Sequence, residues 1–275
     1  MEHVSLTLFS ICLQAAIGIM VFVTIGRLIN KDGVFKNAMF VAAGLGIIGL
    51  FSSMLHLGRP FKAFYALNQF ASSWLSREIW FSGLFVGLTV LAVLVLIIKP
   101  QNKAIINGVS LVASAVGLAA IAVMSSVFTN SSVPFWQGGA TFVEFYAAAI
   151  SMGAIIFLFL SIGEAVKLKK LVAFSVVAAI IVQVVAVMPN LISLANSSNE
   201  AIIGSLAILN GLATVGILKW LFILIGAMLV VWVAKDEISP AMTNTVMVSA
   251  LLLFVGQLVG RYMFYAAMVV GSGLS

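Results

Sequence analysis

The residues of this protein that could do chemistry are few, because only 8% of its residues are charged. His56 and Glu78 fall at the outer ends of long apolar segments. Imidazole titrates near neutral pH and a carboxylate can also accept a proton, so both side chains are candidates for proton chemistry, although His56 could equally be a helix-end residue that faces the lipid head groups. Glu144, Lys219 and Arg261 lie within other apolar segments at a similar depth. Charges inside a membrane are costly and usually functional, so the shared depth predicts a polar pocket between helices.

The sequence offers few ligands for a redox metal. It contains one cysteine, Cys12, and two histidines, His3 and His56. An iron–sulfur cluster usually needs four cysteine ligands, and a bis-histidine haem needs two histidines at similar depth on facing helices. We therefore expect no haem, no iron–sulfur cluster and no metal on this chain. If the protein takes part in redox chemistry, its metal centres must lie on partner subunits.

The composition predicts an integral membrane protein. Of 275 residues, 63% are hydrophobic, and the mean hydropathy is +1.23. A soluble fold cannot hide that much apolar surface, so the lipid bilayer is the expected surroundings. The net charge of +6 comes from only 14 Lys and Arg against 8 Asp and Glu. Such a bias fits membrane orientation, and it predicts no nucleic-acid partner.

Eight segments are long and apolar enough to span a bilayer, which takes about 20 residues each. We therefore predict an all-α polytopic membrane protein, with residues 1–275 forming one integral membrane domain. Eight helices could form two groups of four, divided at Thr129–Gly139. The apolar stretch Asn199–Leu212 is shorter, and it is either an interfacial helix or an extension of the seventh span. The predicted spans are Leu6–Ile29, Ala38–Leu57, Ser76–Ile98, Ala104–Phe128, Ala140–Val166, Leu171–Ala195, Ala213–Ala234 and Met242–Val270.

The distribution of lysine and arginine predicts the orientation. Nine such residues follow spans one, three, five and seven, against five on the opposite side. Positively charged loops stay in the cytoplasm, so the first side is expected to be cytoplasmic. An even number of spans then places both termini outside. The nine residues are Arg27, Lys31, Lys36, Lys99, Lys103, Lys167, Lys169, Lys170 and Lys235.

Several polar residues in the spans also have a purely structural interpretation. Glu78 could form an interfacial ion pair with Arg77, and Glu144 could staple helices by pairing with Lys219 or Arg261. Glu164 is expected to face cytoplasmic water at the inner end of span five. Three further side chains, each an amide within a span, are expected to form hydrogen bonds between helices. They are Gln14, Gln183 and Gln257.

The segment Ser53–Ile79 carries a specific resemblance. It contains His56-Leu57-Gly58-Arg59-Pro60, and later Ser76-Arg77-Glu78-Ile79. This pattern resembles the membrane anchor subunit, called the C subunit, of bacterial anaerobic dimethyl sulfoxide reductases. That family has eight spans, outer termini and a similar length, so the resemblance in pattern covers the whole sequence.

The resemblance implies a role in anaerobic respiration. In the family the matching histidine and glutamate are implicated in menaquinol binding and oxidation, and they correspond to His56 and Glu78. Arg59 and Arg261 are expected to line the same quinol pocket. The implied partners are a molybdopterin catalytic subunit and an iron–sulfur subunit with four clusters. The protein would then be an anchor in the bacterial cytoplasmic (inner) membrane, with periplasmic termini and no complete enzyme activity of its own.

Three alternatives remain at this stage. The protein could anchor a related polysulfide, thiosulfate or selenate reductase, whose quinol site would look alike. A secondary transporter would usually have broken helices and a charge near the membrane midplane. Here the charges sit near one leaflet, and Pro189 is the clearest interruption within a span. A purely structural anchor would lack a quinol site, and substitution of His56 would leave its electron transfer intact.

Overall fold

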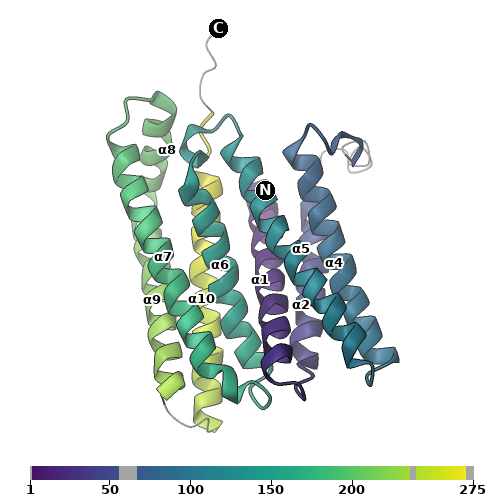
Figure 1. The fold of residues 1–275 in the computed structure, drawn as a ribbon. Coiled ribbons are helices and arrows are strands. Elements are labelled where there is room, and N and C mark those ends of the chain that lie inside the picture. Colours follow the sequence, from purple (N-terminus) through teal and green to yellow (C-terminus); the bar gives the residue numbers. More distant parts are fainter. Residues whose placement is uncertain (1, 56–66, 236–239, 271–275) are drawn as a thin grey trace.

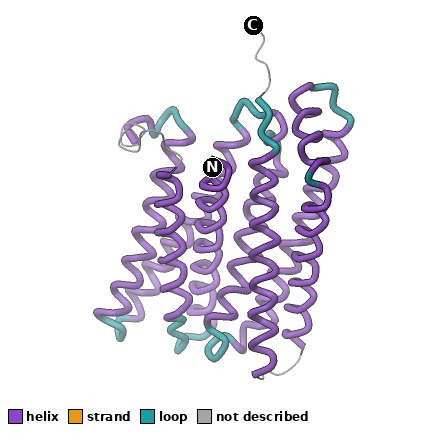
Figure 2. The backbone as a smooth tube through the Cα atoms, turned by 180° about the vertical axis from the view of Figure 1, so that it is seen from behind, coloured by secondary structure: helices purple, strands orange, loops and turns teal. Residues whose placement is uncertain are grey.

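The computed structural model describes residues 2–55, 67–235 and 240–270, and its regular structure in this part of the sequence is helical. Eight helices are long and apolar enough to cross a membrane, which confirms the predicted fold class. They run side by side, with the loops gathered at the two ends of the bundle (Figure 1, Figure 2). Their bounds are α1 Glu2–Ile29, α2 Lys36–Leu55, α4 Trp74–Ile98, α5 Lys103–Thr129, α6 Gly139–Leu160, α7 Lys169–Ala195, α9 Ala213–Lys235 and α10 Pro240–Ala266.

We call the end of the bundle where α1 begins and α10 ends the terminal side, and the opposite end the basic side (Figure 1). The basic side carries the nine lysines and arginines that follow spans one, three, five and seven. The first four long helices pack together, with α1 against α2 and α5 and α4 against α2 and α5. The last four pack in the same way, with α6 against α7 and α10 and α9 against α7 and α10. The two predicted groups of four are therefore present.

Helix α1 lies at the seam between the two groups, because it also packs against α6 and α10. Its most apolar window is 83% buried inside the protein, against 33–61% for the other seven spans. Glycines allow the close approach of α1 and α6: a β-carbon on Gly18 would lie 2.9 Å from the Cα atom of Gly153. Small residues at such crossings let helix backbones touch, which is a main source of helix association in membranes.

One segment differs from the sequence-based expectation, and another decides between two alternatives that the sequence left open. Helix α6 ends at Leu160, six residues before the predicted end of the fifth span, and a turn follows before the short 3₁₀ helix Val166–Leu168. Residues 199–212 form a separate helix, α8 (Glu200–Gly211), rather than an extension of α9. The side chain of Asn199 caps α8 by accepting hydrogen bonds from the backbone N–H groups of Ala201 and Ile202.

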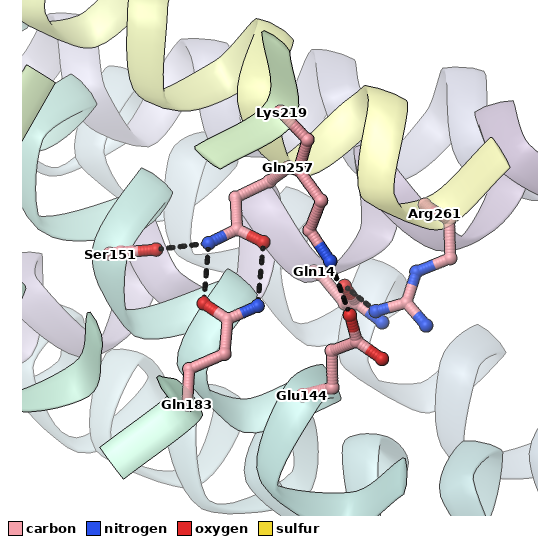
Figure 3. Close-up of polar contacts among 7 residues, drawn as sticks. All are labelled: Gln14, Glu144, Ser151, Gln183, Lys219, Gln257 and Arg261. Atoms are coloured by element: carbon pink, nitrogen blue, oxygen red, sulfur yellow. Dashed lines mark hydrogen bonds and ion pairs between the residues drawn. The ribbon is translucent and has the colours of Figure 1, made fainter. Parts of the chain in front are cut away.

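Polar side chains also link helices within the second group and between the two groups. Gln183 of α7 and Gln257 of α10 exchange side-chain hydrogen bonds of 3.3 and 3.0 Å, and Gln257 also donates to Ser151 of α6 at 3.3 Å (Figure 3). At the basic side, the exposed Glu164 accepts hydrogen bonds from the backbone N–H groups of Val34 and Phe35. Glu164 therefore does more than face water, because it holds the connection between α1 and α2.

Candidate functional site

Glu78 is positioned by the first turns of α4. Ser73 caps this helix, and its side-chain oxygen accepts a hydrogen bond from the backbone N–H of Ser76. Such a cap satisfies one of the free donors at a helix start and fixes where the helix begins. Glu78 follows in the second turn, on the terminal side, and its side chain turns inward so that only 5% of the residue is exposed.

The carboxylate of Glu78 is buried without full hydrogen bonding. Its Oε1 atom has no hydrogen-bond partner among the described residues. The neighbouring Arg77 does not supply one, because its guanidinium donates to the backbone carbonyls of Phe70 and Ala71 at 2.9 and 2.6 Å and stacks over Trp74. The structural interpretation of Glu78 as the partner of Arg77 is therefore wrong. Buried polar atoms are nearly always paired, so an unpaired carboxylate oxygen calls for a ligand.

Arg261 lies in the last turns of α10 and is 3% exposed. Its Nη2 atom donates to Oε1 of Gln14 at 3.0 Å, whereas Nε and Nη1 have no partner among the described residues (Figure 3). The guanidinium carbon lies 3.5 Å from the ring centre of Phe145 and 5.5 Å from that of Phe264. Gln14 in turn donates to the sulfur of Met124 at 3.6 Å. The result is a buried cation over aromatic rings with two unused donors.

Tyr265 is a site residue that the sequence analysis missed. Its buried hydroxyl makes no hydrogen bond of good geometry in the described part of the protein, although Ser10 lies near enough for a weak one. It lies within electrostatic range of Arg261 and also of Glu78, but its hydroxyl makes no hydrogen bond to either of them in the described part of the protein. No ion pair joins Glu78 and Arg261 directly among the described residues. The sequence signal that could have revealed Tyr265 is its spacing of four residues from Arg261, which places both side chains on one face of a helix.

The other intramembrane charges form a separate pair. Nζ of Lys219 on α9 lies 2.8 Å from Oε1 of Glu144 on α6, and the two side chains are 9% and 16% exposed (Figure 3). This confirms the structural interpretation in which Glu144 staples two helices. The three amides Gln14, Gln183 and Gln257 also make the hydrogen bonds between helices that were predicted for them.

Two of the predicted site residues, His56 and Arg59, lie outside the described residues. His56 follows directly after Leu55, the last residue of α2, which ends on the terminal side together with the start of α4. Glu78, Arg261 and Tyr265 are the members of the candidate site that the structure describes.

The described residues offer no obvious binding site for a metal ion. No group of three or more His, Cys, Asp or Glu side chains that could hold a metal ion occurs among residues 2–55, 67–235 and 240–270. Eight apolar spans within the described residues, with unpaired side-chain atoms of Glu78, Arg261 and Tyr265 near the terminal side, define a multi-pass membrane protein with a candidate site for a lipid-soluble ligand.

Comparison with known proteins identifies the family. Residues 1–267 match the DMSO reductase anchor subunit (DmsC). The chain therefore belongs to the family of DMSO reductase anchor subunits. It is a multi-pass membrane anchor of a DMSO reductase-type complex, which implies a catalytic and an electron-transfer partner subunit.

Individual relatives show modest identity. The sequence is 29% identical over 246 residues to the C chain of the anaerobic dimethyl sulfoxide reductase of Escherichia coli, which covers 86% of this protein and 82% of that one. It is 25% identical over 281 residues to the E. coli anaerobic dimethyl sulfoxide reductase chain YnfH, covering 98% and 96%. The match to the corresponding C chain of Haemophilus influenzae is 30% identical over 152 residues and spans about half of each protein (54%).

Proposed function

We propose that this chain oxidises menaquinol at a site on the terminal side and passes the electrons to an iron–sulfur partner subunit. The observation that carries the proposal is the buried carboxylate of Glu78, whose Oε1 atom lacks a hydrogen-bond partner among the described residues. A quinol hydroxyl is a neutral donor that can reach an apolar site from the lipid, and it would satisfy this oxygen. Family membership supports the same assignment.

The proton chemistry follows from the oxidation itself. Removing two electrons from a quinol makes its two hydroxyl groups strongly acidic, so two protons must be accepted nearby. In the proposed arrangement one hydroxyl donates to His56, and the other donates to Glu78 directly or through a water molecule. The product is the quinone, with one proton on each base. A base in hydrogen-bond reach of its proton is the first requirement of such catalysis.

Positive groups around the ring have a second role. The unused Nε and Nη1 donors of Arg261 can bind a quinol oxygen, and they stabilise the negative charge that develops on it as its proton leaves. Arg59 is proposed to orient Glu78 or a quinol oxygen in the same way. Tyr265 lies within electrostatic range of Glu78 and Arg261, and its hydroxyl can position the ring between them.

The partners and the orientation complete the proposal. We assign a four-cluster iron–sulfur subunit as the acceptor of the electrons, and a molybdopterin subunit as the site of reduction of dimethyl sulfoxide or a related S- or N-oxide. The excess of lysine and arginine on the basic side supports a cytoplasmic location for that side. The protein would then lie in the bacterial inner membrane with both termini in the periplasm.

The alternatives differ in what supports them. An anchor for a polysulfide, thiosulfate or selenate reductase would use the same quinol site, and only the partner subunits would distinguish it. A transporter is less well supported, because each of the eight spans within the described residues is one continuous helix, including α7 through Pro189. Transporter sites are usually built from broken helices near the midplane.

The direct test is the substitution His56→Arg in the assembled complex. Arginine keeps a donor and fills the space, but it removes the neutral base. We expect the complex to assemble normally and to lose activity driven by menaquinol analogues. Reduced dyes that feed the iron–sulfur subunit directly should still support reduction of the acceptor. Paired quinol-driven and dye-driven assays in membranes measure both activities.

The control for this test is Lys62→Met, which removes a positive charge six residues further along the same segment. Its quinol-driven rate should match that of the unmodified protein. If His56→Arg also keeps its quinol-driven rate, His56 has no part in the chemistry and the proposed mechanism fails.

A further inference from the structure

A cavity of about 410 Å³ opens within the second group of helices, apart from the site at Glu78. It is bounded by α6, α7, α8, α9 and α10 near the terminal side. Small-molecule sites typically have volumes of roughly 300–1,000 Å³ and mostly apolar walls with a few polar groups. Here Trp220, Met263 and Phe264 contribute to the apolar walls. The ion pair of Glu144 and Lys219 contributes the charged groups, beside the amides of Asn190 and Asn210.

The ion pair of Glu144 and Lys219 is largely buried, with side chains 16% and 9% exposed. Two buried charges cost more to desolvate than an apolar pair of similar size, so such a pair is weak support for stability. Helix α10 is shaped to admit the lysine: a β-carbon on Gly260 would lie 2.6 Å from Cε and 2.9 Å from Nζ of Lys219. A β-carbon on Gly256, one turn earlier, would likewise lie 3.1 Å from the backbone oxygen of Lys219.

The pair offers both halves of a hydrogen-bonding site. An ammonium group has three N–H donors, and one of those on Lys219 serves Glu144. The others can donate to a carbonyl oxygen in the cavity, and the carboxylate of Glu144 can accept from a hydroxyl. Because the two charges cancel, the polar end of the cavity favours a neutral head group over a phosphate. The ring of Trp220, whose centre lies 5.0 Å from Nζ, gives a flat apolar surface beside it.

From this geometry we propose that the cavity binds a second ring of the quinone class, with Lys219 and Glu144 as its polar contacts. A donor next to an acceptor suits a ring that carries a carbonyl oxygen when oxidised and a hydroxyl when reduced. Glu78 lies in the first group of helices, whereas Arg261 and Tyr265 of the candidate site lie on α10, which forms one wall of the cavity; none of the three lines it. The inference does not depend on the proposed chemistry at Glu78 and His56.

The test uses a photoreactive naphthoquinone with the intact complex in membranes, followed by mass spectrometry of the cross-linked peptides. We expect labelling within residues 187–220. The substitution Ala213→Trp places an indole in the cavity and should lower this labelling at least about tenfold, a loss of about 1.4 kcal/mol in binding. Ala207→Trp is the matched control, because Ala207 is exposed on α8 and does not line the cavity. It should leave the labelling unchanged.

Further experiments distinguish the possible ligands of the cavity from one another, and they distinguish the cavity from the site at Glu78. A photoreactive phospholipid should not label the cavity; labelling by the phospholipid and not by the naphthoquinone would overturn the inference in favour of a lipid. Equal labelling of Ala213→Trp and the unmodified complex would also overturn it. Glu78→Gln should abolish quinol-driven turnover and leave the cavity labelled. If Ala213→Trp abolishes turnover instead, the cavity is the turnover site, and the claim of a second ring is wrong.

Discussion

Two buried arginines at opposite ends of the bundle differ in how they are hydrogen-bonded. At the basic side, Arg27 is 5% exposed, and its guanidinium donates to Oδ1 of Asn107 at 2.6 Å and to the backbone oxygen of Val34 at 2.8 Å. At the terminal side, the equally buried Arg261 leaves two of its nitrogen donors without a partner among the described residues. The two arginines have the same chemistry and similar burial, so the difference lies in what each is paired with.

The same contrast holds for the acidic groups. Glu164 at the basic side accepts two backbone hydrogen bonds, whereas Oε1 of Glu78 at the terminal side accepts none within the described residues. The unpaired side-chain atoms at the basic side, among the described residues, are the hydroxyls of Ser110 and Ser161, which are neutral and cost less to bury than a charged group. Paired charges hold helices together, and unpaired ones cost free energy unless a ligand completes them. The comparison therefore separates structural polar groups from candidate functional ones.

The largest effect is expected from replacing the carboxyl group of Glu78. Glu78→Gln keeps the size of the side chain but removes the proton acceptor, so the quinol-driven rate should fall by roughly 10²–10⁴, as for loss of a general base. Dye-driven activity and the amount of complex should stay the same, and steady-state assays with both donors measure this. Glu164→Gln is the control at the basic side, with an unchanged quinol-driven rate. A comparable loss of rate in both variants would remove the distinction between the two ends.

The next effect is one of stability, at Arg27. Arg27→Met removes charged hydrogen bonds and leaves Asn107 and the Val34 carbonyl unpaired, which should cost about 2–4 kcal/mol. We expect less complex in the membrane and a lower thermal midpoint in detergent, with an unchanged turnover number for each assembled complex. Lys31→Met, an exposed substitution at the same side, should change neither quantity. If the Arg27→Met protein is stable but its turnover is impaired, the structural role given to Arg27 at the basic side is wrong.

A smaller effect is expected from Tyr265→Phe. The hydroxyl makes no hydrogen bond of good geometry within the described residues, so its removal should not destabilise the protein. If it positions the quinol ring, quinol-driven kcat/KM should fall about tenfold, chiefly through a higher KM, corresponding to about 1.4 kcal/mol. Tyr262→Phe is the matched control, because Tyr262 lies on the same helix and is 42% exposed. Unaltered kinetics in Tyr265→Phe would exclude the hydroxyl from the site.

The smallest effect is expected at the surface of the basic side. Nζ of Lys103 lies 3.2 Å from Oδ1 of Asp32, but the two side chains are 54% and 96% exposed. Exposed ion pairs contribute about 0.2–1 kcal/mol, so Asp32→Asn should shift the thermal midpoint only slightly and leave turnover unchanged. A loss of stability as large as that of Arg27→Met would show that burial does not determine how much these polar contacts contribute to the stability of the protein.

Much of the fold could be predicted from the sequence, because a bilayer demands about 20 apolar residues in each span. Such runs mark the eight long helices to within a few residues of most of their ends. The end of α6 was placed too late, since Ile162 and Ala165 continue the apolar run although the backbone has already turned. The twelve-residue α8 was left open because its length fits neither a span nor a loop. The cap at Asn199 was the local signal of its start.

The site was partly predictable for a different reason. Charges such as Glu78 and Arg261 stand out in an apolar sequence, so their depth alone suggests a common pocket. Tyr265 does not stand out, because it follows Phe264 among aromatic residues that pack together. Whether its hydroxyl is paired depends on helices far away in the sequence. The same holds for the choice of Lys219 rather than Arg261 as the partner of Glu144, since both were at a suitable depth.

The burial of α1 has a consequence for how the protein is made. Helix α1 is synthesised first, yet the helices that cover it include α6 and α10, which emerge much later. Proteins are made from the N-terminus at about 5–20 residues each second, so α1 waits in the membrane for the second half of the protein. During that interval Gln14 lacks Arg261, and Gly18 faces lipid instead of Gly153. A nascent polypeptide that stops after α5 would leave these surfaces of α1 without the helices that cover them in the finished protein.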